Sequence, residues 1–268
     1  MDDVVAVPAA EIPTWWGVVA SFALVALAAL VSWRVRLGLT RELVWVALRA
    51  LVQLVAVGLL LGLVFEFGGL ATAFGWLAIM VAIGGQVAGR RARGLPGAVR
   101  VATIAVAFGA VATMGILLLL GIIDATPMVV IPVGGMVISW TMVATGVALR
   151  RVRDSVGSSR DRIEARLALG LNPTQAYEEQ RRDAVRTALL PAIDSTKVVG
   201  LIALPGAMTG LILAGVEPLA AIRYQIVVMY MLLAGPALAA ATATWMAERD
   251  LFDSAQRLRR FSVPAGSS

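Results

Sequence analysis

Long apolar runs separated by short charged blocks constrain this sequence more than any other feature. Runs of roughly 17 to 25 apolar residues are long enough to cross the hydrocarbon core of a bilayer as helices. Lipid offers no hydrogen-bond partner to a bare backbone, so such spans must be helical. We therefore expect an all-α, polytopic membrane helix bundle with about seven transmembrane helices. The expected spans are about 15–33, 43–65, 70–89, 99–123, 127–149, 190–214 and 218–246.

The composition also points to a membrane protein. Of the 268 residues, 59% are hydrophobic and only 15% are charged, and the mean hydropathy is +0.85. A soluble domain carries about a quarter charged residues. The net charge of +6 could suggest a nucleic-acid partner, but the basic residues stand in short blocks between the apolar spans. That pattern is typical of orientation signals, with anionic membrane lipids as the counter-charge, so no nucleic-acid partner is expected.

The arginine content alternates from loop to loop. The loops after the first, third, fifth and seventh expected spans hold 3, 4, 9 and 4 arginines. The N-terminal segment and the loops at Glu66, Asp124 and Glu217 hold none. Because basic loops stay in the cytoplasm, the N-terminus is predicted outside and the C-terminus in the cytoplasm. The expected location is the cell (plasma) membrane, as a multi-pass protein.

Two residue types are missing from the sequence, which limits the chemistry of any site. The chain has no cysteine and no histidine, so disulfides and thiolate metal sites are excluded and a dedicated zinc site is disfavoured. Carboxylates, carbonyls, hydroxyls and methionine sulfur leave iron, manganese or a non-metal substrate open. The only lysine is Lys197, and no glycine-rich turn precedes it. The chain therefore has no Walker A loop, and if ATP drives it, another chain binds the nucleotide.

The longest polar stretch, 150–190, runs without a linker into the next apolar span. Signals for a helix end and a helix start predict two helices in it, Ile163–Leu171 and Thr174–Leu190. They would meet at a sharp corner on the cytoplasmic surface, a shape that could fit a groove in a partner protein. A capped helix pair could equally occur in any cytoplasmic loop. The residues expected to shape the corner are Gly170, Asn172, Pro173 and the anchoring aromatic Tyr177.

Two stretches carry a family resemblance. The run E-A-R-L-A-L-G at Glu164 to Gly170, followed by Asn172-Pro173 and a later Leu-Leu-Pro, resembles the coupling-helix loop of ABC importer permeases, with a longer distance to the Leu-Pro. The segment KVVGLIALPGAMTGLILAGVEPLAAIRYQIVVMYM at 197–231 resembles the signature of the iron-export ABC permease family of the FetB type. That family also includes plant aluminium-sensitivity permeases. The resemblance covers nearly the whole chain from Arg49 to Met231.

The resemblance implies one transmembrane permease domain over residues 1–268, with 150–190 as its coupling loop. Such a permease would form a homodimer with two copies of a separate ABC ATPase and export iron or a related metal ion. ATP and Mg would be bound by the ATPase, so this chain would hold no cofactor or catalytic residue and would not be an enzyme by itself. The implied ATPase-coupling residues are Glu164, Gly170, Asn172, Pro173 and Tyr177.

Charged and polar residues at membrane depth are candidates for the translocation path. Asp194 and Lys197 lie three apart on one helix face, which the hydropathy places just inside the cytoplasmic boundary. They are either a local pair that anchors the sixth span or a gate that transmits motion of the corner. Arg49 and Gln53, four apart on the second span, could face this pair across the bundle.

Pro205 and Gly206 interrupt the sixth expected span. Interrupted helices line cavities because their freed backbone groups need partners other than lipid. With Met208 and Thr209 beside it, this bend is a second candidate for the translocation path, and a plain packing kink is the alternative. The sequence leaves the residues of any metal site unknown.

Two other classes of function remain open. An ion-gradient-driven secondary transporter would need titratable acids at mid-membrane, and the spans contain only Asp194. A non-transporting membrane receptor or scaffold would need no ATPase partner. The coupling-loop pattern favours the ATP-driven transporter over both.

Overall fold

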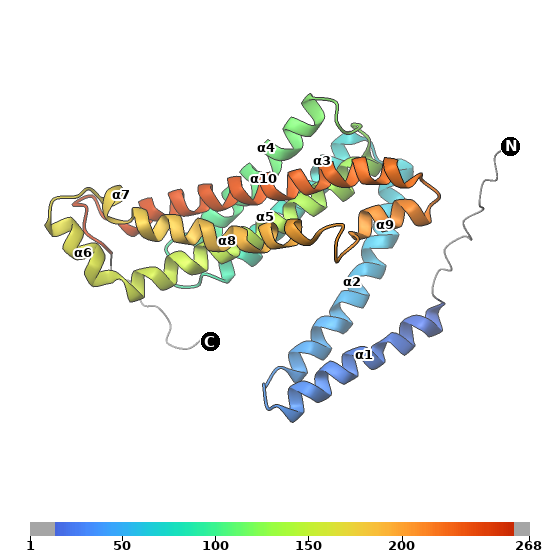
Figure 1. The fold of residues 1–268 in the computed structure, drawn as a ribbon, viewed down its shortest axis with the longest axis horizontal. Coiled ribbons are helices and arrows are strands. Elements are labelled where there is room, and N and C mark those ends of the chain that lie inside the picture. Colours follow the sequence, from blue (N-terminus) through green and yellow to red (C-terminus); the bar gives the residue numbers. More distant parts are fainter. Residues whose placement is uncertain (1–13, 260–268) are drawn as a thin grey trace.

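The structure is a computed structural model that describes residues 14–259, and this part of the chain contains ten helices and no β-strand. Figure 1 shows that α5, α8 and α10 run side by side along the long axis of the molecule. The helices are α1 (Trp15–Arg34), α2 (Thr40–Phe67), α3 (Leu70–Arg90), α4 (Ala98–Leu119), α5 (Pro127–Ser158), α6 (Arg160–Ala168), α7 (Pro173–Ala176), α8 (Glu178–Val198), α9 (Gly206–Leu213) and α10 (Pro218–Leu251).

Six of these helices are long and apolar enough to cross a membrane: α1, α2, α3, α4, α5 and α10. The all-α membrane bundle is therefore confirmed, and the chain is a multi-pass membrane protein. The predicted count of seven is not confirmed, because the stretch expected as a sixth span, 190–214, is not one helix. The predicted orientation of the termini stays a prediction, and residues 1–13, on which part of it rests, lie outside the described residues.

The expected sixth span breaks between α8 and α9. α8 ends at Val198, Gly200 has a φ of +77°, and Pro205 is the N-cap of α9. The left-handed backbone at Gly200 is available to glycine at little cost. A proline disfavours the helical conformation in the residue before it, so Pro205 keeps Leu204 out of a helix, and α9 begins at Gly206. The sequence predicted a break at Pro205 and Gly206. In the structure the non-helical stretch is longer and begins at Val199.

Helices α3, α4, α5 and α10 pack together through small residues, and α8 lies along α5 and α10. A Cβ atom added to Gly89 of α3 would lie 2.5 Å from the Cα of Val99. One added to Gly109 of α4 would lie 2.8 Å from the carbonyl oxygen of Gly235 in α10. Between apolar helices in lipid, such close approach of backbones supplies much of the association energy.

The hairpin of α1 and α2 diverges from this bundle (Figure 1). α1 packs mainly on α2, and none of the most apolar stretch of α2, Thr40–Gly62, is buried. Apolar side chains on both helices therefore face outward, where lipid or other protein must cover them.

Helices α5 and α10 are longer than the hydrocarbon core of a bilayer is thick. They have 32 and 34 residues, or about 48 and 51 Å at 1.5 Å per residue, against a hydrocarbon core about 30 Å thick. Their ends pack with α6, α7, the start of α8 and residues 252–259 around a shared apolar core that includes Leu149, Val152, Ile163 and Tyr177. We call this part of the molecule the head. It contains the polar stretch 150–190 and is cytoplasmic in the predicted topology.

Candidate functional site

The corner between α6 and α7 is built by local signals in the sequence. The α6 helix is followed by Gly170, whose φ is +90°. Asn172 caps α7 by accepting the backbone N–H of Gln175 at 2.9 Å, and the Gln175 side chain accepts the backbone N–H of Asn172 at 3.3 Å. Pro173 occupies the first helical position. The helix start at Asn172-Pro173 is therefore confirmed, although the expected helix 174–190 is divided at Tyr177 into α7 and α8.

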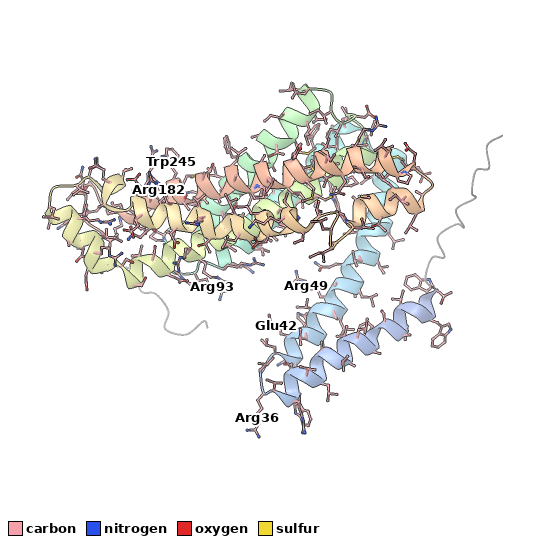
Figure 2. All side chains as sticks on the ribbon, viewed as in Figure 1. Arg36, Glu42, Arg49, Arg93, Arg182 and Trp245 are labelled. Carbon is pink, nitrogen blue, oxygen red and sulfur yellow. The ribbon has the colours of Figure 1, made fainter. Side chains whose placement is uncertain are left out.

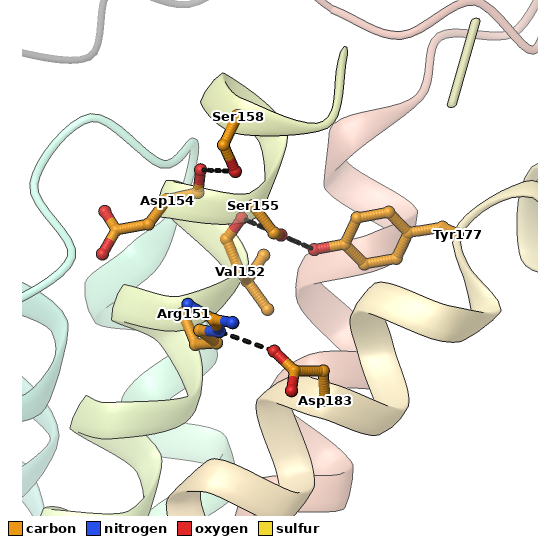
Figure 3. Close-up of polar contacts among 7 residues, drawn as sticks. All are labelled: Arg151, Val152, Asp154, Ser155, Ser158, Tyr177 and Asp183. Atoms are coloured by element: carbon orange, nitrogen blue, oxygen red, sulfur yellow. Dashed lines mark hydrogen bonds and ion pairs between the residues drawn. The ribbon is translucent and has the colours of Figure 1, made fainter. Parts of the chain in front are cut away.

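Tyr177 lies inside the head rather than on its surface. Its ring is fully buried and meets Phe252 edge-on, with 6.5 Å between ring centroids. Its hydroxyl lies 2.9 Å from the Ser155 hydroxyl of α5 (Figure 3). Burial raises the pKa of the Tyr177 phenol well above its usual value, so the group stays neutral. The side chain anchors the corner on α5 and on the chain after α10, and a partner cannot contact it while the head is folded.

The surface of the corner is formed by other residues. Leu169, at the end of α6, is 80% exposed, and a Cβ on Gly170 would meet no atom within 4 Å. Asn172 is exposed as well. Glu164 lies one turn earlier and pairs with Arg160 at 2.7 Å within α6. Sequence reasoning did not single out Leu169, although a leucine beside a glycine in a polar stretch was a visible signal.

Ion pairs fasten the start of α8 to its neighbours. Arg151 of α5 donates to Asp183 at 2.6 Å (Figure 3), and Arg181 donates to Glu248 of α10 at 2.8 Å. The Glu248 side chain is only 6% exposed, so this second pair is shielded from water and is costly to separate. Together with Tyr177, these contacts tie the corner and the start of α8 to two long helices, α5 and α10, so a displacement of the corner acts on both.

The ion pair of Asp194 and Lys197 is present, with 3.2 Å between the Lys197 Nζ and Asp194 Oδ1 atoms and both side chains exposed. Asp183 contacts Arg151, so it marks the position on α8 that lies beside the polar end of α5. Along the axis of α8, Asp194 lies about 16 Å and Lys197 about 21 Å beyond Asp183. The placement of this pair just inside the cytoplasmic boundary stays a prediction. Charges at that depth require water or protein around them.

The chain between α8 and α9 is exposed and not helical. Leu201 and Ile202 are 86% and 83% exposed, and Gly206 and Met208 belong to α9 beyond the break. The Thr209 hydroxyl donates to the Pro205 carbonyl at 3.2 Å, so it satisfies a backbone group locally. Irregular backbone at membrane depth is tolerated only where protein buries it or where it lines a water-filled cavity. This stretch therefore needs a second protein surface or water beside it.

The structure does not bring Arg49 and Gln53 to the Asp194–Lys197 pair. Both lie exposed on α2, and Figure 2 shows Arg49 on the part of α2 that leans away from the bundle. Within residues 14–259, no hydrogen bond or ion pair joins either residue to Asp194 or Lys197.

No metal centre is formed by the described side chains. Residues 14–259 contain no group of three or more acidic side chains that could hold a metal ion. The residues that would contact a transported ion therefore remain unassigned within one copy of the chain.

Six apolar helices, a polar head and a broken helix beside an exposed ion pair define the class of this protein as a multi-pass helical membrane protein. Residues 15–252 match the model of the "Uncharacterised protein family (UPF0014)". The chain belongs to this family.

Relatives within the family extend over nearly the whole chain. The rice "UPF0014 membrane protein STAR2" is 40% identical over 90% of this chain and 84% of its own length. The Arabidopsis thaliana "Protein ALUMINUM SENSITIVE 3" is 36% identical over 90% of this chain and 88% of its own. The Escherichia coli "Probable iron export permease protein FetB" is 36% identical over 88% of this chain and 91% of its own. These relatives bear out the family that the sequence resembles, and no solved structure matches the chain.

Proposed function

We propose that this chain is the transmembrane permease subunit of an ATP-driven ABC transporter that exports iron or a related metal ion. A separate ATPase subunit would bind ATP and Mg and supply the hydrolysis. The observation that carries the proposal is the corner at Leu169 and Gly170, which exposes an apolar side chain at the tip of the head while Tyr177 fixes it to α5 and to Phe252 after α10. The name of the Escherichia coli relative supports iron as the cargo and export as the direction.

The proposed mechanism follows the contacts from the corner into the membrane. An ATPase that closes on ATP would push on the corner, and α8, which follows Tyr177 directly, would move with it. The Arg181–Glu248 and Arg151–Asp183 pairs would pass the displacement on from α8 to α10 and α5. The far end of α8 carries Asp194 and Lys197 and then the non-helical stretch before α9. Movement of this end would open and close a path for the ion, as in other alternating-access transporters.

A homodimer is part of the proposal. One copy leaves the apolar stretch of α2 unburied and the backbone of 199–205 exposed at membrane depth. A second copy would cover part of these surfaces and enclose a central path between the two broken helices.

The test is transport in inside-out vesicles from cells that express the chain with its ATPase. We expect ATP-dependent accumulation of Fe²⁺ that is lost in Leu169→Asp and kept in Leu169→Met, because the methionine preserves an apolar tip. Fe²⁺ accumulation that ATP does not change, in vesicles that hold the ATPase, would refute the proposal.

A second candidate is an ion-gradient-driven transporter, and the position of Asp194 along α8, far from the head, favours it. An acid about 16 Å along α8 from Asp183 stands where a coupling proton could be exchanged. In that case accumulation would require a proton gradient without ATP and would be abolished by Asp194→Asn.

A further inference from the structure

A groove of about 390 Å³ lies between α8 and α10 on the outside of the bundle. Figure 2 shows two of its residues, Arg182 and Trp245, close together near the head. The proposed ATPase interface and ion path do not include it. Its lining includes Arg181, Arg182, Val185, Arg186, Thr244 and Trp245.

The groove carries more positive charge than the nearby acids neutralise. Arg181 forms an ion pair with Glu248. Arg182 forms an ion pair with Glu178 at 2.6 Å, and the Arg182 side chain is exposed to solvent. Within residues 14–259, Arg186 and Arg249 form no ion pair. The Arg249 guanidinium instead lies 3.7 Å from the centre of the Trp245 ring. An anion beside these residues would therefore be attracted by several guanidinium groups at once.

The groove lies at the membrane boundary. No charged residue occurs in α10 between Arg223 and Glu248, so Trp245 stands at the last apolar turn of that helix. Arg186 is one turn along α8 from Asp183, whose contact with Arg151 marks the polar end of α5. Tryptophan and arginine at this level are the side chains that meet lipid head groups.

The same face of α8 becomes apolar toward the membrane interior. Leu190 and Ile193 follow Arg186 at the helical spacing of one and two turns, and both are exposed. A molecule with an anionic head in the groove would find an apolar surface for its chains directly beside it. A soluble anion would gain nothing from that surface.

We propose that this groove binds the phosphodiester head group of an anionic phospholipid, with Arg182 and Arg186 beside the phosphate and Trp245, on which Arg249 stacks, beside the glycerol. The lipid would contact both α8 and α10 on the outer surface of the bundle. Near the same position, the ion pair of Arg181 and Glu248 joins these two helices within the bundle. This site is independent of the cargo and of the energy source.

The test measures lipid binding to the full-length protein in phosphatidylcholine nanodiscs that contain increasing fractions of phosphatidylglycerol. The variant is Arg182→Gln with Arg186→Gln, and the matched control is Arg90→Gln with Arg93→Gln, which removes two exposed arginines at the same end of the molecule. Bound lipid is counted by mass spectrometry after exchange into detergent. We expect phosphatidylglycerol retention about 25-fold weaker in the variant and nearly unchanged in the control, since each guanidinium at an anionic surface contributes roughly fivefold.

A second readout guards against a misfolded variant. Brominated phosphatidylglycerol should quench part of the tryptophan fluorescence of the wild type, and Trp245→Phe should remove that part. Equal loss of lipid in variant and control, or no loss in a folded variant, would overturn the site. Competition by inorganic phosphate would show a free-anion site instead of a lipid site. Loss of a bound ATPase with lipid retention intact would show that the groove is a protein interface.

Discussion

At the scale of single residues, the motif around Tyr177 predicted where this residue lies in the chain relative to the helix start, but not which side chains surround its ring. The sequence placed an aromatic one turn past the Asn172-Pro173 start, and the residue does lie there. It could not show that the ring faces inward, because its neighbours Ser155 and Phe252 are distant in sequence. Burial of Glu248 against Arg181 was equally invisible, since the two residues are brought together only by the packing of α8 on α10.

Substitution of Tyr177 tests this inward role. Tyr177→Phe keeps the ring and loses the contact with Ser155, so we expect a loss of about 0.5–1.5 kcal/mol of stability. Tyr177→Ala empties a buried aromatic site and should cost about 3–5 kcal/mol. Unfolding of the purified protein in mixed micelles measures both. Equal and small effects would place the ring outside the core.

At the scale of elements, most helices were predictable because hydropathy and capping are local properties. Six of the seven expected spans, the helix start at Pro173 and the break near Pro205 were anticipated from residue patterns. The extent of the break was not, because Gly200 adopts a positive φ that only the path of the chain reveals. The length of α5 and α10 beyond the membrane was also missed, since their polar ends were taken as loop and tail.

Close packing of α3 on α4 gives an element-scale prediction. Gly89→Ala would place a Cβ atom 2.5 Å from the Cα of Val99, so the helices must move apart. We expect a loss of about 1–3 kcal/mol in the same unfolding measurement.

Gly115→Ala is the matched control for that substitution. A Cβ on Gly115 of α4 would meet nothing within 4 Å, and alanine favours a helix over glycine by about 1 kcal/mol. Its stability should be unchanged or slightly raised. A loss in Gly115→Ala as large as that in Gly89→Ala would show that close helix contact is not the cause.

At the scale of the whole molecule, sequence patterns could not place the α1–α2 hairpin. Spans that are all apolar carry little information about which neighbour each one contacts. Arg49, which could have faced Asp194 across the bundle, lies instead on the diverging α2. The same limit applies to the homodimer and the ion path, which depend on surfaces that one copy leaves open.

The absence of native cysteine makes the environment of the broken helix measurable. In the assembled protein, a cysteine at Ile202 should react with a membrane-impermeant maleimide if water lines this stretch, because the thiolate forms only in water. Ile116→Cys, on an exposed apolar face of α4, should stay unreactive in lipid. Labelling of the second position but not the first would contradict a water-lined path at the break.

The claim that a partner ATPase docks at the corner is tested most directly by purifying the tagged protein from native membranes in mild detergent. Mass spectrometry would identify the recovered partners for the wild type, Leu169→Asp and Leu169→Met. We predict that an ABC ATPase is recovered with the wild type and the methionine variant and is lost with the aspartate variant, while all three stay folded. Recovery of the ATPase with Leu169→Asp, or no ATPase with the folded wild type, would contradict the account.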